Sequence, residues 1–174
     1  MSFLFDRQAI ESSKSHSVLH AEHFQSAYLT NDIDRACSLF AEQLGINAFQ
    51  RLEGEIPSGG HIRVELAWVG NVMYELMQTT HSVESVYALQ PGPNDPFSLV
   101  HHHLGYVAAD RGQWDQILAS AQAHGFEIAY RNRTEGFLEV CFIDVPWLPH
   151  YLEYFLLEPA GRSFLQSVPQ NPGS

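Results

Sequence analysis

The sequence predicts an α+β fold in which two tandem βαβββ modules form one curved mixed sheet, a cup with its helices on the outside. Segments with strand-like and helix-like patterns follow one another in the same order twice along the 174 residues. The chain has the size of one ordinary domain, so the two modules are expected to share one site. Matching residues of the two modules lie 78 positions apart, and the pairs are Gln25 and His103, Tyr28 and Tyr106, Asp32 and Asp110, and Glu75 and Glu153.

The first module is expected over residues 21–89, after a polar N-terminal extension over residues 1–20. Its first strand, residues 23–29, precedes Asp32, a residue type that caps helix N-termini. Apolar residues at helical spacing follow over residues 33–44, and Gly45 ends this helix. Three runs with strand-like composition complete the module, at residues 48–52, 62–69 and 72–78.

The second module is expected over residues 101–158, after a linker over residues 90–100 that contains several Pro and Gly residues. Residues 103–109 form its first strand, Asp110 caps a helix at residues 114–124, and Gly125 ends that helix. Three further strands are expected at residues 126–131, 136–143 and 151–157. The C-terminal tail, residues 159–174, begins and ends with Pro and Gly residues and is expected to fray.

The charge of the chain argues against several kinds of partner. It has 20 acidic and 9 basic residues, a net charge of −11 with histidine neutral, which argues against nucleic acids and anionic membrane surfaces. No apolar run is long enough to span a membrane, and the start lacks the pattern of a secretory signal. The two cysteines form no zinc motif and no disulfide framework. We therefore expect a soluble, reduced, cytoplasmic protein.

Each module places one glutamate inside an apolar strand. Glu75 lies within Val-Met-Tyr-Glu-Leu-Met, and Glu153 lies within Tyr-Leu-Glu-Tyr-Phe. A carboxylate is costly to bury unless it is paired, hydrogen-bonded or bound to a metal. A single glutamate in an apolar strand is more often exposed at a sheet edge. Here the two glutamates lie 78 positions apart, as do Gln25 and His103, and this shared spacing favours a site. Strand alternation puts the small Gly105 beside His103, which leaves space on that face.

Four segments together resemble the vicinal oxygen chelate superfamily, which includes glyoxalase I, bleomycin-resistance proteins, acyl-CoA epimerases and extradiol dioxygenases. The segments are residues 24–36, 72–78, 102–110 and 150–155. In that superfamily each βαβββ module supplies one metal ligand from its first strand and one from its last. The resemblance therefore implies four ligands, of the same types as in eukaryotic-type glyoxalase I: Gln25, Glu75, His103 and Glu153.

The first of these ligands has an alternative. His23 precedes Gln25 by two residues, is expected on the same face of the strand, and is the stronger ligand type. Spacing favours Gln25, because Asp32 follows it by seven residues, as Asp110 follows His103. The other members of the histidine run, residues 101 and 102, are interpreted only as neighbours of the ligand.

One imidazole nitrogen, two carboxylates and an amide oxygen suit a divalent metal such as Zn, Ni, Mn, Co or Mg. Such a metal can polarise a carbonyl and stabilise the charge left by removing an adjacent proton. By the resemblance to glyoxalase I, Glu153 is the catalytic base and Glu75 its counterpart. The sequence thus predicts an isomerase, epimerase or lyase that acts on a small, partly apolar organic molecule. Four residues are expected to line its substrate pocket: Met73, Met77, Trp147 and Tyr151.

Two other functions remain open at this point. An Fe(II) extradiol-type dioxygenase uses two histidines and one carboxylate, which would require His23 in place of Gln25. A non-catalytic binding protein of the bleomycin-resistance kind needs an apolar cup without a metal set. Glutathione or coenzyme A would need cations, for which Arg51, Arg63, Arg131 and Arg133 are candidates. The resemblance also implies a homodimer, and the cup could be built within one chain or across two.

Overall fold

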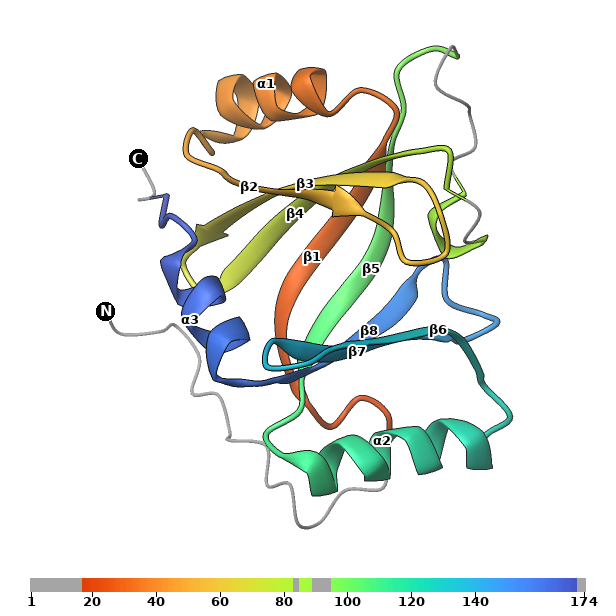
Figure 1. The fold of residues 1–174 in the computed structure, drawn as a ribbon. Coiled ribbons are helices and arrows are strands. Elements are labelled where there is room, and N and C mark those ends of the chain that lie inside the picture. Colours follow the sequence, from red (N-terminus) through yellow and green to blue (C-terminus); the bar gives the residue numbers. More distant parts are fainter. Residues whose placement is uncertain (1–16, 83–84, 89–94, 172–174) are drawn as a thin grey trace.

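A computed structural model describes residues 17–82, 85–88 and 95–171, and they form one eight-stranded sheet curled into a half-barrel (Figure 1). The strands lie in the order β2-β3-β4-β1-β5-β8-β7-β6. The first module comprises β1 (Glu22–Thr30), α1 (Ile33–Leu44), β2 (Gln50–Glu55), β3 (His61–Val69) and β4 (Val72–Thr80). The second comprises β5 (Leu99–Val107), α2 (Arg111–Ala123), β6 (Glu127–Thr134), β7 (Leu138–Asp144) and β8 (Tyr151–Leu157).

The predicted cup is confirmed, and a single chain forms it. The modules meet where β1 pairs antiparallel with β5, while β1–β4 and β5–β8 are parallel pairs. This arrangement gives the mixed sheet that the repeat predicts, with the first and last strand of each module at its centre. Both modules bend toward the same side, and α1 and α2 lie on the outside at the top and bottom of Figure 1.

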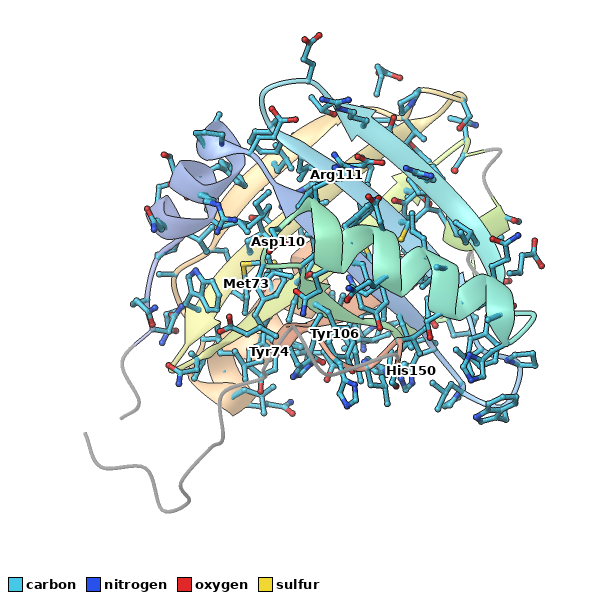
Figure 2. All side chains as sticks on the ribbon, turned by 90° about the horizontal axis from the view of Figure 1, so that it is seen from below. Met73, Tyr74, Tyr106, Asp110, Arg111 and His150 are labelled. Atoms are coloured by element: carbon cyan, nitrogen blue, oxygen red, sulfur yellow. The ribbon has the colours of Figure 1, made fainter. Side chains whose placement is uncertain are left out.

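The two outer helices begin at the predicted caps. The Asp32 carboxylate accepts the backbone N–H of Arg35 at 3.0 Å, and Gly45 ends α1 with φ 73°. The Asp110 carboxylate accepts the N–H of Gln113 at 2.8 Å, and Figure 2 shows Asp110 at the beginning of α2. These caps position the helices so that their apolar faces pack against the outside of the sheet.

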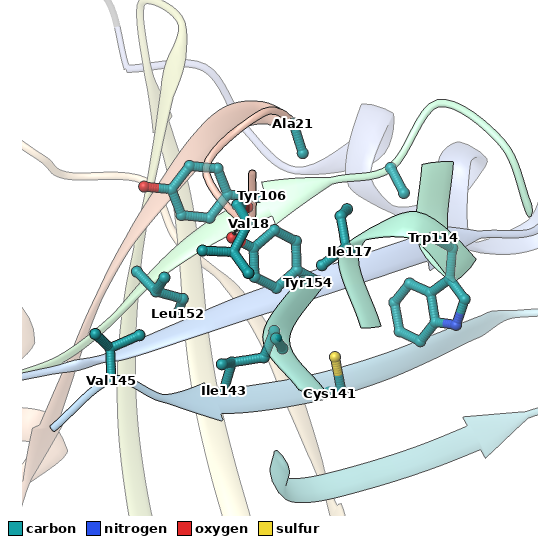
Figure 3. Packing of buried hydrophobic residues seen from close by; sticks show 12 residues of the cluster. Val18, Ala21, Tyr106, Trp114, Ile117, Cys141, Ile143, Val145, Leu152 and Tyr154 are labelled. Atoms are coloured by element: carbon teal, nitrogen blue, oxygen red, sulfur yellow. Dashed lines mark hydrogen bonds between the residues drawn. The ribbon is translucent and has the colours of Figure 1, made fainter. Parts of the chain in front are cut away.

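The main core cluster lies between α2 and the outer face of the second module (Figure 3). Trp114 and Ile117 of α2 pack there with Tyr154 of β8. The Tyr154 hydroxyl donates a hydrogen bond to the carbonyl of Val18. Val18 and Ala21 are buried in this cluster, so residues 17–21 belong to the packed structure. The rest of the predicted N-terminal extension, residues 1–16, lies outside the described residues.

Residues 159–171 of the predicted C-terminal tail are not frayed, so the prediction is wrong for them, and residues 172–174 lie outside the described residues. Residues Pro159–Ser167 form a helix, α3, which lies at the open side of the cup in Figure 1. Phe164, Leu165 and Val168 pack against the apolar cluster of the cup face. Beyond α3, the backbone N–H of Trp68 donates to the carbonyl of Pro169 at 2.9 Å. Burial of apolar side chains at helical spacing outweighs the Pro and Gly residues that end the segment.

The predicted linker, residues 90–100, needs revision. It includes the beginning of β5 at Leu99, and its residues 90–94 are among those not described. In the first module, a single-turn helix, η1 (Ser85–Tyr87), follows β4.

Within residues 17–82, 85–88 and 95–171, no helix has the length and apolar character needed to cross a membrane.

Pairing of β1 with β5 contains a β-bulge at Phe24. His23 lies opposite Tyr106, but Gln25 lies opposite Gly105, so Phe24 is an extra residue on β1. A bulge interrupts the alternation of faces, because two residues of one strand oppose one of the other. His23 therefore lies on the outer face, where its ring is 5.2 Å from that of Tyr106. The expectation that His23 and Gln25 share a face is wrong for this reason.

A second bulge, on β5, lies at His102. Ala27 is opposite His103 and Tyr28 is opposite His101, which leaves His102 as the extra residue. His101 accordingly faces the outside, with its ring 5.5 Å from that of Tyr28. The bulge turns His102 toward His103 instead, and their Nδ1 atoms are 2.9 Å apart. The run of three histidines thus divides between the two faces of the sheet.

Candidate metal centre

The four predicted ligands meet on the cup face of the four central strands. Gln25 comes from β1, Glu75 from β4, His103 from β5 and Glu153 from β8. The register of the strands brings these side chains together, because Ala27 lies opposite both Glu75 and His103. The small side chain of Ala27 lets Glu75 and His103 approach each other. The four side chains are buried, with relative exposures of 2% for Gln25, 9% for Glu75, 1% for His103 and 6% for Glu153.

Donor atoms of these residues lie close enough to share one ion. His103 Nε2 is 2.6 Å from Glu153 Oε2 and 3.2 Å from Glu75 Oε2. Glu75 Oε2 also accepts a hydrogen bond from Gln25 Nε2 at 2.6 Å. One donor atom each from Glu75, His103 and Glu153 lies within 4.8 Å of the others. These distances are those of a group converging on one point rather than of separate surface residues.

Three of the buried donor atoms lack a hydrogen bond from any described residue: Gln25 Oε1, His103 Nε2 and Glu153 Oε2. The short distance from His103 Nε2 to Glu153 Oε2 therefore does not have the direction of a hydrogen bond. Buried polar atoms without partners are costly, and an ion between them would satisfy all three. One nitrogen and three oxygen donors fit a divalent metal of intermediate hardness.

The charges of the site reinforce this interpretation. Burial by itself lowers the pKa of His103, but the carboxylates of Glu153 and Glu75 reverse the effect and raise it to about 9. Burial raises the pKa of Glu153 to about 7, with His103 opposing that rise and Glu75 adding to it. Two carboxyl groups this close need their charge offset, by a proton on His103 or Glu153 or by a metal ion.

Gly105 gives Gln25 its place. A Cβ atom at residue 105 would lie 2.4 Å from Gln25 Oε1 and 2.7 Å from Gln25 Cβ, which is too close for any side chain. The prediction of space beside the ligands is confirmed. Residue 105 lies opposite Gln25 on β5, so only glycine leaves room for the Gln25 side chain beside the backbone of β5.

The residues expected to line the substrate pocket divide into two groups. Met73 and Met77 are buried on the cup face, in the cluster against which α3 packs. Tyr151 contacts the rings of His102 and Phe142 in the second module. Trp147 is 73% exposed and lies against Phe126 on the α2 side, so its expected place in the pocket is wrong. Trp147 lies near the last strand in the sequence, but it belongs to the loop before β8, and this loop places its ring outside the cup.

A cavity of about 1460 Å³ lies where α3, the β3–β4 turn and the chain before β1 come together. Phe24, Trp68 and Leu165 give it an apolar wall, and Arg162 of α3 adds a cation. Phe24 directly precedes Gln25, so the cavity begins next to a ligand strand. The sequence did not predict this cavity because the expectation of a frayed tail left out α3.

Fold and site together define a protein of the vicinal oxygen chelate fold, with two βαβββ modules and polar residues from the central strands meeting in the cup. No protein-family model matches the sequence, and no curated protein matches it either. Solved structures do match. The chain is similar to methylmalonyl-CoA epimerase from Mycobacterium tuberculosis, with 15% identity over 86% of this chain and 95% of that one, at a TM-score of 0.55.

Two further structures support the same fold. A variant of Streptomyces coelicolor methylmalonyl-CoA epimerase, in complex with 2-nitronate-propionyl-CoA, has 13% identity over 79% of this chain and 97% of that one, at a TM-score of 0.52. A variant of 4-hydroxymandelate synthase from the same organism has 11% identity over 83% of this chain and 51% of that one, at a TM-score of 0.50. At such identities the likeness establishes the fold, and this fold is the one that the resemblance in the sequence implied.

Replacing Gly105 with alanine tests the geometry of the first ligand. The added methyl group displaces Gln25, so we expect Gly105→Ala to bind zinc on the order of 10-fold more weakly in a competition titration with a chromophoric chelator. Gly54→Ala is the matched control, because no atom lies within 4 Å of a Cβ placed on β2 at that position. Equal affinities in the two variants would show that Gln25 is not a ligand.

The raised pKa values predict how metal binding depends on pH. A proton on His103 or Glu153 competes with the metal, and their pKa values are about 9 and about 7. Raising the pH through these values removes the competing protons, so zinc affinity should rise with pH. Calorimetric titrations in buffers below, near and above the pKa of Glu153 measure this and should detect proton release. An affinity that does not change with pH would contradict the assignment of these two ligands.

Proposed function

We propose that this protein is a metal-dependent enzyme that moves a proton at a carbon next to a carbonyl group, as isomerases, epimerases and some lyases do. The observation that carries this proposal is the buried meeting of Glu75, His103 and Glu153, with the unpartnered amide oxygen of Gln25 beside them. A bound divalent ion supplies Lewis acidity, which polarises a carbonyl oxygen and makes the neighbouring C–H bond more acidic.

Glu153 is the better candidate for the base. Its pKa is raised to about 7, chiefly by burial, so it can both take and return a proton near neutral pH. Its Oε2 atom receives no hydrogen bond from any described residue. Glu75 differs, because Gln25 Nε2 holds its Oε2 at 2.6 Å. A carboxylate with fewer hydrogen bonds is freer to move toward a substrate, which supports Glu153 as the base, while Glu75 would hold the ion.

The substrate is a small, partly apolar carbonyl compound, in keeping with the apolar cluster, Met73 and Met77 included, that surrounds the polar side chains on the cup face. The similar epimerase structures contain coenzyme A esters in their complexes. In this chain several arginines form ion pairs with carboxylates instead of remaining available for phosphate groups. Arg51 and Arg63 share Glu65, Arg111 and Arg131 share Glu139, and Arg133 contacts Glu158.

The alternative of an Fe(II) dioxygenase finds less support. Its metal needs two histidines and one carboxylate, yet His23 lies against Tyr106 on the outer face. Within the described cup, His103 is the histidine whose free nitrogen faces the two carboxylates. A binding protein without chemistry would favour an apolar cup, whereas this one buries four polar side chains at its centre.

Proton exchange in deuterated water tests the proposal without knowledge of the natural substrate. The protein is loaded with Zn, Ni or Co and mixed with a panel of 2-substituted acyl thioesters, 2-oxo acids and hemithioacetals, and deuterium uptake is followed by NMR. We expect uptake next to the carbonyl for at least one class. Glu153→Gln should lower its rate by about 100-fold or more while the fold survives.

The matched control for this variant is Glu135→Gln, which changes an exposed glutamate in the turn between β6 and β7. It should exchange deuterium at the wild-type rate. Full exchange by Glu153→Gln would remove Glu153 as the base. If oxygen uptake with Fe(II) and a catechol appeared in place of deuterium exchange, the dioxygenase would replace the function proposed here.

A further inference from the structure

Two consecutive histidines of β5 lie side by side on the cup face, although neighbouring residues of a strand normally point to opposite faces. The bulge at His102 causes this exception, because it adds one residue between the pairs Ala27–His103 and Tyr28–His101. The rings of His102 and His103 have centroids 5.2 Å apart at 78°, and their Nδ1 atoms are 2.9 Å apart. Bulges next to functional sites commonly re-aim a side chain, and this one brings a second imidazole to the ligand histidine.

The far side of the His102 ring fixes the position of its proton. His102 Nε2 is 2.5 Å from the backbone carbonyl oxygen of Val86, in η1. A carbonyl oxygen can only accept a hydrogen bond, so His102 Nε2 must carry hydrogen and donate. This hydrogen bond joins η1 to the second module. It thereby links the segment after β4 to β5, the strand that carries His103.

The surroundings of His102 favour a neutral ring with no second proton. Its exposure is 6%, and the Tyr87 ring stacks on it with centroids 5.9 Å apart at 11°. The rings of Phe142 and Tyr151 enclose it at 5.5 and 5.4 Å. An apolar shell of this kind disfavours an imidazolium. With the one hydrogen on Nε2, His102 Nδ1 has a lone pair and can only accept.

The direction of the hydrogen bond between the histidines follows from this. His103 Nδ1 carries hydrogen and donates to His102 Nδ1 across the 2.9 Å separation. The lone pair of a neutral His103 is then on Nε2, the atom that lies 2.6 Å from Glu153 Oε2 and 3.2 Å from Glu75 Oε2. The series Val86 carbonyl, His102, His103 therefore directs a nitrogen lone pair at the point where the carboxylates converge.

We propose that His102 is a positioning residue that fixes the tautomer and ring orientation of His103 for a divalent cation, with Val86 holding His102 in turn. This inference rests on the proposed metal site. Partners of this kind behind a ligand histidine change metal affinity by about 10- to 100-fold when they are removed. They are usually carboxylates or backbone carbonyls, and here an imidazole takes that role and passes the constraint to a carbonyl one step further away.

Two substitutions separate positioning from simple packing. His102→Phe keeps a flat ring among Tyr87, Phe142 and Tyr151 but removes both nitrogen atoms. His102→Gln gives up the ring but keeps a group that can accept from His103 with its oxygen and donate to Val86 with its nitrogen. Packing alone predicts that phenylalanine is the better replacement, whereas positioning predicts that glutamine is. The two roles thus order the variants in opposite ways.

Zinc affinity of the full chain, measured by competition titration, gives the first readout. We expect His102→Phe to bind zinc about 10- to 100-fold more weakly than the wild type and His102→Gln to recover most of that loss. Thermal unfolding of the metal-free proteins shows whether the phenylalanine variant is folded. Wild-type affinity in a folded His102→Phe variant would overturn the inference and leave the metal site standing.

Long-range proton–nitrogen NMR of the wild type, labelled with ¹⁵N-histidine and loaded with zinc, needs no variant. We expect hydrogen on Nε2 of His102 and on Nδ1 of His103, with zinc on Nε2 of His103. Hydrogen on Nδ1 of His102, or zinc on Nδ1 of His103, would contradict the inference. Failure of the wild type to bind any zinc is a separate result, since it would overturn the proposed metal site and the positioning role together.

Discussion

The whole arrangement depends on two carboxylates that the sheet buries within reach of one imidazole. Glu75 and Glu153 both have an oxygen within 3.2 Å of His103 Nε2, in a setting where charge is poorly solvated. Like charges at this separation repel strongly unless a cation lies between them. This need for a cation accounts for the raised pKa of His103. It also explains why Ala27 and Gly105 must be small, and why the four side chains suit a divalent ion.

Duplication of the βαβββ module is what makes such a meeting available. Each module contributes an acid from its last strand, and antiparallel pairing of β1 with β5 brings the two sets face to face. Outside the sheet, α1 and α2 cover the apolar faces, and the buried carboxylates of Glu65 and Glu139 form ion pairs that join neighbouring strands. The ligands therefore stand on central strands that are paired on both sides, which limits their movement more than loops would.

The sequence predicted the repeated modules and the four side chains that meet, because both depend on residue types and spacing that recur at one offset. It did not predict the bulges at Phe24 and His102, since an extra residue is decided by cross-strand contacts and not by composition. Strict alternation therefore placed His23 on the wrong face of β1. For the same reason His102 was interpreted only as a neighbour of the ligand. The signal available for His102 was the run of three histidines itself.

Errors elsewhere have the same origin in tertiary contacts. The segment that begins at Pro159 contains Phe164, Leu165 and Val168, spaced three and four residues apart, but their burial depends on the cup face that they cover. Trp147 was expected in the pocket because it is near the last strand in the sequence, but its loop places the ring against Phe126 on the α2 side. Local signals such as Asp32 and Asp110 gave the correct helix caps because a cap is satisfied within one turn of its own chain, although α2 begins at Arg111 and not at the predicted Trp114.

X-ray absorption spectroscopy of the full chain, purified without chelator and reconstituted with cobalt or zinc, shows whether these side chains bind a divalent ion. We expect one divalent ion per chain, bound by a single imidazole and otherwise by oxygen donors, with loss of that signal when Glu75 and Glu153 are both changed to Gln. A wild-type chain that takes up no ion, or an ion bound by two imidazoles, would contradict this expectation.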